Sequence, residues 1–190
     1  EISACLVGSE MCIRDSIEVP NAGLCLLIIW LPRLFNMLSL LTEDGSDLKD
    51  TEARVKAIFI LQRLVTDEPQ EYKEQELAFN RILTGCPFQV PLPKTLKLAD
   101  YEIMTIESMI IGIKNNCEKF KNISAKGFQL NFIERPGRLE QREDKWVLYV
   151  EGRSYDMLLD FLPWSYRLVQ LPWLEKRINV VWRDKGEFDF

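Results

Sequence analysis

The feature that most constrains the fold is a run of apolar residues near the start of the chain, from Ala22 to Leu31. A membrane-spanning helix needs about 20 predominantly apolar residues, and this run is about half that length before Pro32 and Arg33 interrupt it. No basic segment precedes the run, which argues against a secretion signal. We therefore expect a buried core helix that Pro32 ends or kinks, and no membrane span.

The composition is that of a globular protein. The chain has 190 residues, of which 47% are hydrophobic and 28% are charged, so we expect a single domain with short end segments. The net charge of −5 argues against nucleic-acid binding, which requires a concentrated basic surface. The five Cys form no Cys-x-x-Cys pair. We interpret them as buried thiols of a protein from a reducing cytoplasm, since their spacing does not favour a disulfide.

The sequence lacks the residues that most often build an active site. It contains no His, the usual base that activates a Ser or Cys nucleophile, and no Gly-rich phosphate-binding loop. Asp156 and Asp160 are four residues apart, and such a pair could perform acid–base chemistry or bind a hard cation. We favour the interpretation that both belong to the solvated face of a helix. The sequence therefore predicts no catalytic residue, no metal site and no cofactor.

Three helices are predicted in the central part of the chain. The first begins near Asp50 or Thr51, and the second ends at Gly85. The third begins at Asp100 and has the most regular pattern, in which apolar residues alternate at spacings of three and four: Ile103, Ile106, Ile110, Ile113, Cys117 and Phe120. This pattern favours packing within the chain. Self-association through the Ile103–Phe120 helix is the alternative.

The C-terminal part has a strand-like pattern. Residues 138–143 and 146–151 predict a hairpin, and residues 166–170 and 178–182 are further strand candidates. The fold class that follows is α+β, with a mainly helical N-terminal part packed against a small antiparallel β-sheet near the C-terminus.

A Leu-Pro-Trp motif occurs twice in the C-terminal part, with Pro163 and Trp164 in the first copy and Pro172 and Trp173 in the second. Each proline fixes the backbone and predicts a corner. Each tryptophan supplies a large apolar surface and one N–H that requires a partner. The two corners could pack into the core, which we favour, or could present both tryptophans as anchors of an interface.

The order of these motifs resembles the conserved C-terminal region of contractile injection system tape measure proteins, which belong to bacterial phage-tail-like particles. The resemblance covers residues 17–182 and includes Val-Pro-Asn-Ala-Gly-Leu at 19–24 and Phe-Ile-Glu-Arg-Pro-Gly-Arg-Leu at 132–139. The other matching segments are residues 31–35, 61–66, 80–87, 121–124, 155–160 and 180–182, together with both Leu-Pro-Trp corners. The chain departs from the family pattern at residues 28–30 and at Phe59.

The resemblance implies a structural protein that takes part in setting the length of the tube and sheath, without catalytic residues. A compact domain of this size has a radius of gyration of about 16 Å, whereas a ruler must be extended, at about 1.5 Å per residue if it is helical. We therefore expect this region to anchor the ruler to baseplate, tube or cap subunits. It would be cytoplasmic during assembly and then part of the particle. The alternative is a generic protein-binding adaptor without a measuring role.

The ends of the chain are expected to lie outside this domain. Residues 1–16 resemble translated sequencing-adapter DNA, and we expect them to be an artefact without order. Residues 183–190 form a charged tail. The expected domain is therefore residues 17–182, and because the chain starts at Glu1 we expect a longer natural protein.

Overall fold

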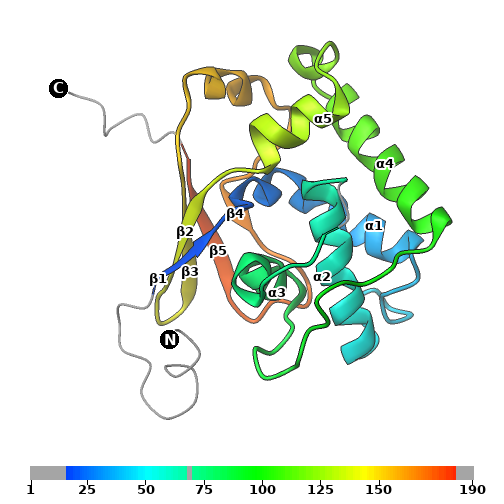
Figure 1. Cartoon of the computed structure of the whole chain (residues 1–190). Coiled ribbons are helices and arrows are strands. Elements are labelled where there is room, and N and C mark those ends of the chain that lie inside the picture. The colour runs from blue at the N-terminus through cyan, green and yellow to red at the C-terminus, as the bar shows by residue number, and fades with distance from the viewer. Residues whose placement is uncertain (1–15, 68–69, 183–190) are drawn as a thin grey trace.

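The computed structural model describes residues 16–67 and 70–182. Helices lie on one side of the molecule and a twisted sheet lies on the other (Figure 1). The longer α-helices are α2 (Thr51–Val65) and α4 (Asp100–Asn115), and the shorter ones are α1 (Leu31–Met37), α3 (Ala78–Thr84) and α5 (Ala125–Phe128). Single turns and 3₁₀ or π segments are η2 (Ala22–Trp30), η3 (Glu74–Leu77), η4 (Glu118–Phe120), η5 (Gln129–Ile133) and η6 (Ser154–Phe161).

The sheet has five strands in the order β1-β2-β3-β5-β4. The strands are β1 (Ser16–Val19), β2 (Gly137–Gln141), β3 (Lys145–Val150), β4 (Leu168–Val169) and β5 (Arg177–Val181). The β2–β3 hairpin and both later strands are where the alternating pattern predicted them, and the α+β class is correct. The expected antiparallel sheet is wrong in one pairing, because β3 and β5 run parallel. A parallel pair needs a long crossover, which residues 151–176 provide.

The sheet is also not confined to the C-terminal part of the chain. Strand β1 pairs antiparallel with β2 and begins at Ser16, which pairs with Glu140. The expected domain boundary after residue 16 therefore falls inside a strand. The sequence predicted an artefact without order at residues 1–16 and a charged tail at residues 183–190. Of these, residues 1–15 and 183–190 lie outside the described residues.

The apolar run forms the buried segment that the sequence predicted. Residues 22–28 are all buried in η2, and α1 continues the chain without a break. Pro32 lies in the first turn of α1, where its missing N–H leaves no helical hydrogen bond unmade. It marks the change from 3₁₀ to α geometry and does not end the helical segment. Within the described residues, no helix is both long enough and apolar enough to cross a membrane.

The helix ends follow the predicted capping chemistry. The carboxylate of Asp50 accepts a hydrogen bond of 2.7 Å from the N–H of Ala53 at the start of α2. Gly85 ends α3 in the left-handed conformation, with φ of 61°, which glycine adopts without strain.

The apolar seam of α4 packs within the chain, as favoured from its spacing. Ile106, Ile110 and Ile113 are buried, and the helix contacts α2, α1 and α5. The helix ends at Asn115, so Cys117 and Phe120 reach the core from the turn that follows. The core occupies this seam, so any self-association of α4 must use another face of the helix.

Two backbone segments of this core approach each other closely at Gly23. A Cβ atom built there would be 1.8 Å from the carbonyl oxygen of Phe132 and 2.6 Å from the Cα of Ile133. The neighbouring N–H of Ala22 donates to the carbonyl of Arg135 at 2.8 Å. Only glycine therefore allows η2 to lie directly against the end of η5.

We expect Gly23→Ala to lower the free energy of unfolding by about 2–3 kcal/mol, because the backbone of η5 must move to admit the methyl group. Gly152→Ala is the matched control, since a Cβ at that position meets no atom within 4 Å. Chemical denaturation of both variants measures the difference. Equal stabilities for the two would contradict the close approach at Gly23.

Candidate functional site

The two Leu-Pro-Trp corners are fastened to the helical layer by their indole groups. The Nε1 of Trp164 donates to the carbonyl of Leu26 at 2.9 Å, and its ring lies edge-on to Trp30 with centroids 5.8 Å apart. The Nε1 of Trp173 donates to the carbonyl of Leu83, also at 2.9 Å. Pro163 and Pro172 are exposed at the corners themselves.

Both tryptophans contact the core. Trp173 is buried and packs on Phe35, with ring centroids 5.6 Å apart. Trp164 is half-buried and packs against the main hydrophobic core. The corners therefore hold the crossover between β3 and β5 against η2 and α3.

The two candidate carboxylates do not form a pair. Asp156 is completely buried, whereas Asp160 is exposed. The interpretation of both as a solvated face is wrong for Asp156. The segment η6 is a 3₁₀ helix with three residues per turn, so side chains four residues apart point in different directions. This geometry removes the two-carboxylate site, and no cluster of His, Cys, Asp and Glu that could hold a metal exists among the described residues.

Asp156 instead forms a bidentate ion pair with Arg135. The guanidinium nitrogens lie 2.8 and 2.9 Å from the two carboxylate oxygens, and both side chains are completely buried. The indole of Trp182 and the backbone N–H of Arg153 each donate to Oδ2 of Asp156, at 2.9 and 2.8 Å. The carboxylate therefore has charge-assisted bonds to both of its oxygens.

The guanidinium of Arg135 is also bound by groups other than Asp156. It donates to the carbonyls of Asn131 and Glu151, at 2.5 and 2.9 Å. The rings of Tyr155 and Trp182 lie over it, with centroids 5.4 and 5.2 Å from its central carbon. These contacts compensate a charge that would be costly in the interior, and they fit a structural role.

A second buried polar cluster joins the segment before η2 to α2 and α3. The amide nitrogen of Asn21 donates to Oδ1 of Asn80 at 2.7 Å. The amide nitrogen of Asn80 donates to Gln62 at 3.1 Å and to the carbonyl of Ile58 at 3.0 Å. This cluster contains amides only, so it holds helices together and offers no acid or base.

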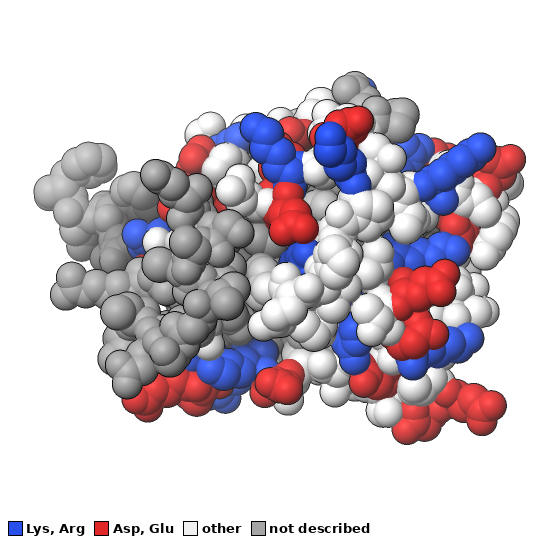
Figure 2. Space-filling model, turned by 60° about the horizontal axis from the view of Figure 1, so that its bottom comes forward, with Lys and Arg blue, Asp and Glu red and all other residues white. Residues whose placement is uncertain are grey.

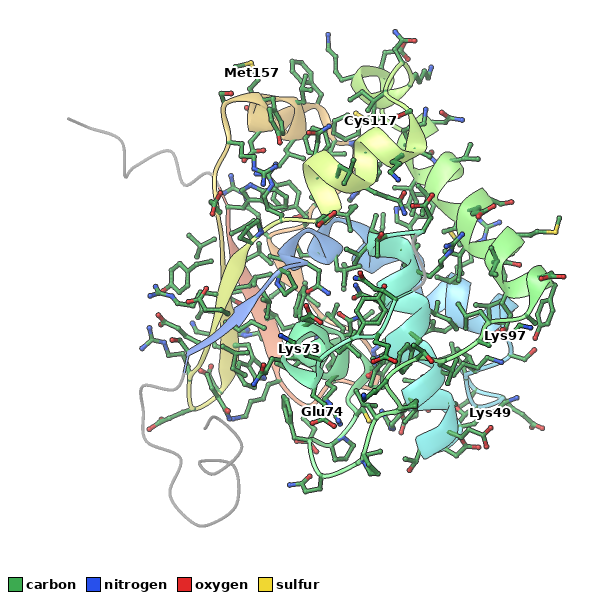
Figure 3. All side chains as sticks on the ribbon, viewed as in Figure 1. Lys49, Lys73, Glu74, Lys97, Cys117 and Met157 are labelled. Carbon is green, nitrogen blue, oxygen red and sulfur yellow. The ribbon has the colours of Figure 1, made fainter. Side chains whose placement is uncertain are left out.

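The three cysteines among the described residues belong to the core. Cys25, Cys86 and Cys117 are buried and free, and burial raises the pKa of the Cys25 thiol far above its usual range. Ser46 and Lys49 have the Ser-x-x-Lys spacing of some Ser–Lys nucleophile pairs. They lie in the exposed loop before α2, where the Ser46 hydroxyl bonds to the carboxylate of Asp44 at 2.8 Å. Lys49 lies on the outside of the molecule (Figure 3).

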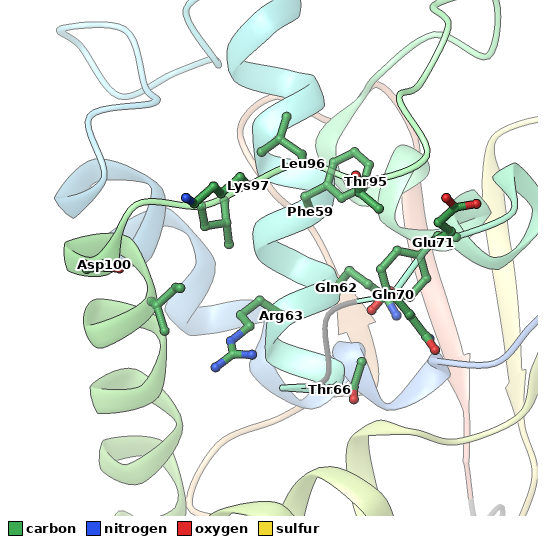
Figure 4. A pocket seen from close by; sticks show the side chains of 13 residues that line it. Phe59, Gln62, Arg63, Thr66, Gln70, Glu71, Thr95, Leu96, Lys97 and Asp100 are labelled. Carbon is green, nitrogen blue, oxygen red and sulfur yellow. The ribbon is translucent and has the colours of Figure 1, made fainter.

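A cleft of about 510 Å³ lies beside α2. One wall is α2, with Phe59 and Gln62, and the other is the extended segment before α4, with Leu96 (Figure 4). Arg63 extends from α2 toward α4 (Figure 4), where it pairs with Glu107 at 2.8 Å. No pattern of neighbouring residues indicates this cleft, because its lining comes from separate segments that only the fold brings together.

The chemistry of the cleft is that of a binding surface. The apolar side chains of Phe59 and Ile103 contribute to its lining, along with charged groups of both signs such as Lys97 and Asp100. Burial raises the pKa of Tyr72, which keeps the phenol neutral. The lining therefore offers apolar contacts and charges of both signs.

Charges are interspersed on the outer surface. On the face of the described residues drawn in Figure 2, Lys and Arg alternate with Asp and Glu, and no broad basic area forms.

Comparison with known protein families gives a match over most of the chain. A model of the family described as contractile injection system tape measure protein matches residues 10–182. The chain belongs to this tape measure protein family. No curated protein and no solved structure matches it. The family match agrees with the resemblance found in the sequence, and both span nearly the whole chain.

The region shared with tape measure proteins contains the buried framework described above. It ends at Trp182, the residue whose indole binds Asp156. It also includes Gly23, both Leu-Pro-Trp corners and Arg135.

We expect Asp156→Asn to lower the free energy of unfolding by about 3–5 kcal/mol, because it leaves the guanidinium of Arg135 buried without its counter-charge. Asp160→Asn makes the same chemical change at an exposed site and should alter stability by less than about 1 kcal/mol. Denaturant titration of the two variants compares them directly. If Asp156→Asn were as mild as Asp160→Asn, the buried pair would not be essential to the fold.

Proposed function

We propose that this domain is the folded, non-catalytic anchoring region of a tape measure protein, in a bacterial contractile injection system whose tube and sheath length that protein sets. The observation that carries the proposal is the family match over residues 10–182, taken together with the compact shape of those residues that the structure describes. The longest described helix has 16 residues and spans about 24 Å at 1.5 Å per residue. An element of this length is short for a ruler, so a measuring role belongs to another part of the protein.

The framework supports an anchoring role. Arg135, Asp156 and both corner tryptophans tie the crossover to the helices and the sheet. We expect a domain held in this way to bear a mechanical load without local unfolding. The reason is that the crossover between β3 and β5, which has little regular structure, is hydrogen-bonded to the rest of the core. We infer that its partners are baseplate, tube or cap subunits, and that it is cytoplasmic until the particle is assembled.

Deletion of residues 17–182 from the complete protein in a particle-producing cell tests this role. We expect few particles or particles of widely scattered length, measured by electron microscopy, because the ruler then lacks its attachment. An unrelated folded domain of similar size in the same position is the control and should not restore particle length. Particles of normal length and yield after the deletion would rule the role out.

A point variant tests whether assembly needs the domain to be folded or only needs it to be present in the chain. Asp156→Asn in the complete protein should reduce particle yield at growth temperatures where the domain unfolds, and Asp160→Asn should not. A normal yield from an unfolded Asp156→Asn domain would show that assembly does not need the folded anchor.

A further inference from the structure

The loop between α1 and α2 contains the one Asp-Gly pair of the chain, Asp44-Gly45, and no Asn-Gly pair occurs in the sequence. In an Asp-Gly pair the backbone nitrogen of the glycine can attack the carboxyl group of the aspartate, because glycine has no Cβ to obstruct the approach. Asp44 is exposed, so burial does not shield it. Its sequence therefore makes this peptide link the one most open to spontaneous rearrangement.

The rearrangement converts aspartate to isoaspartate without changing the composition of the chain. The nitrogen of Gly45 forms a bond to Cγ of Asp44, and the Cγ–OH bond breaks, so that the hydroxyl group leaves as water with the amide hydrogen. The resulting succinimide ring then takes up water again. Addition at Cγ restores aspartate, whereas addition at the backbone carbonyl carbon gives isoaspartate, in which the main chain runs through the side chain. The neutral carboxylic acid reacts, because the ionised carboxylate has no hydroxyl group to lose.

The structure holds the carboxylate of Asp44 in its ionised form. The hydroxyl of Thr42 donates to Oδ1 at 2.6 Å, and the hydroxyl of Ser46 lies 2.8 Å from both carboxylate oxygens. The backbone N–H of Ser46 also donates to Oδ1, at 3.2 Å. These bonds, with that from Thr42 as the largest cause, lower the pKa of the Asp44 carboxyl to about 2. The neutral acid that reacts is therefore rarer here than in an unfolded chain.

The attacking nitrogen is held by a different partner. The N–H of Gly45 donates to the carbonyl of Thr42 at 2.9 Å, and the N–H of Thr42 donates to the carbonyl of Asp47 at 2.8 Å. A bridge between the buried Leu41 and Leu48 closes the base of the loop. Ring closure therefore requires that the bonds of both reacting groups break within a loop that is fixed at its base.

The same loop joins two helices, so damage to its backbone would affect more than one residue. Asp47 pairs with Arg54 of α2 at 2.6 Å. Arg54 also donates to the carbonyl of Thr84 at the end of α3, at 2.7 Å. Isoaspartate at residue 44 adds one atom to the main chain and would displace Asp47 from this contact.

We propose that the hydroxyl groups of Thr42 and Ser46 protect Asp44-Gly45 from isomerisation to isoaspartate. They do so by occupying both oxygens of the carboxylate and by turning it away from the attacking nitrogen. This protection does not depend on the proposed anchoring role, because it concerns the chemistry of one loop. It matters most in a protein that is not replaced after it has been assembled.

Ageing of the 190-residue chain compares the folded loop with the same residues in a synthetic peptide of residues 40–49. Both samples are incubated for weeks between mildly acidic and neutral pH, and isoaspartate at residue 44 is measured by chromatography and mass spectrometry after proteolysis. We expect the folded chain to react at least about tenfold more slowly, because its neutral acid is rarer and its nitrogen is bonded. Equal rates in the chain and the peptide would overturn the proposal.

Two variants test whether the hydroxyl groups supply the protection. Ser46→Ala and Thr42→Val should each raise the rate of isomerisation several-fold, and the double variant should raise it by about tenfold. Ser108→Ala removes a hydroxyl from an exposed serine of α4 and should leave the rate unchanged.

Circular dichroism shows whether each variant is folded when its rate is measured. If the double variant unfolds, Ser46→Ala alone decides, because Ser46 is exposed and lies outside the core. A folded variant that forms isoaspartate no faster than the parent chain would overturn the protective role of the hydroxyl groups.

Discussion

Arg135 carries its charge in the interior of the domain, and the fold depends on how that charge is held. Desolvation of a guanidinium is costly unless its donors and its charge are matched. Here its donors reach Asn131 at the end of the helical layer, Glu151 at the end of β3, and Asp156 in the crossover. Trp182 at the end of β5 completes the set through Asp156. Four distant segments are therefore fixed relative to one another by one side chain.

The crossover between the parallel strands β3 and β5 is held against the helical layer by hydrogen bonds and apolar packing. Residues 151–176 contain only one short 3₁₀ helix and two residues of edge strand, so local structure gives them little rigidity. The two Leu-Pro-Trp corners compensate for this, because each indole N–H binds a carbonyl of the helical layer. A tryptophan in such a position contributes apolar burial and one directed bond at the same time.

The fold leaves two kinds of surface for contact with other molecules. The cleft beside α2 is a mixed apolar and charged concavity that continues to the base of α4. Helix α4 lies at the outer edge of the helical layer and exposes Tyr101, Met104 and Ile111. A domain with a rigid interior and such surfaces suits a structural component of a particle, in which several contacts must be made without a chemical step.

The sequence by itself determined the features that depend on neighbouring residues. Its patterns placed the buried run at Ala22, the cap at Asp50, the helix end at Gly85, the isoleucine seam and the β2–β3 hairpin. These follow from local backbone preferences and from the period of apolar residues, so no distant contact is needed to predict them. The ordered motifs also indicated the family.

The tertiary structure alone decided which polar residues are buried and which surfaces remain free. Asp156 and Asp160 look equivalent in the sequence, yet Arg135, 21 residues before Asp156, makes one of them interior. Strand β1 joins a sheet whose other strands begin more than a hundred residues later. The cleft and the free face of α4 likewise depend on which segments pack together. The burial of Asp156, the place of β1 and the free surfaces all depend on contacts between residues far apart in the sequence. The spacing of neighbouring residues does not show which of these contacts form.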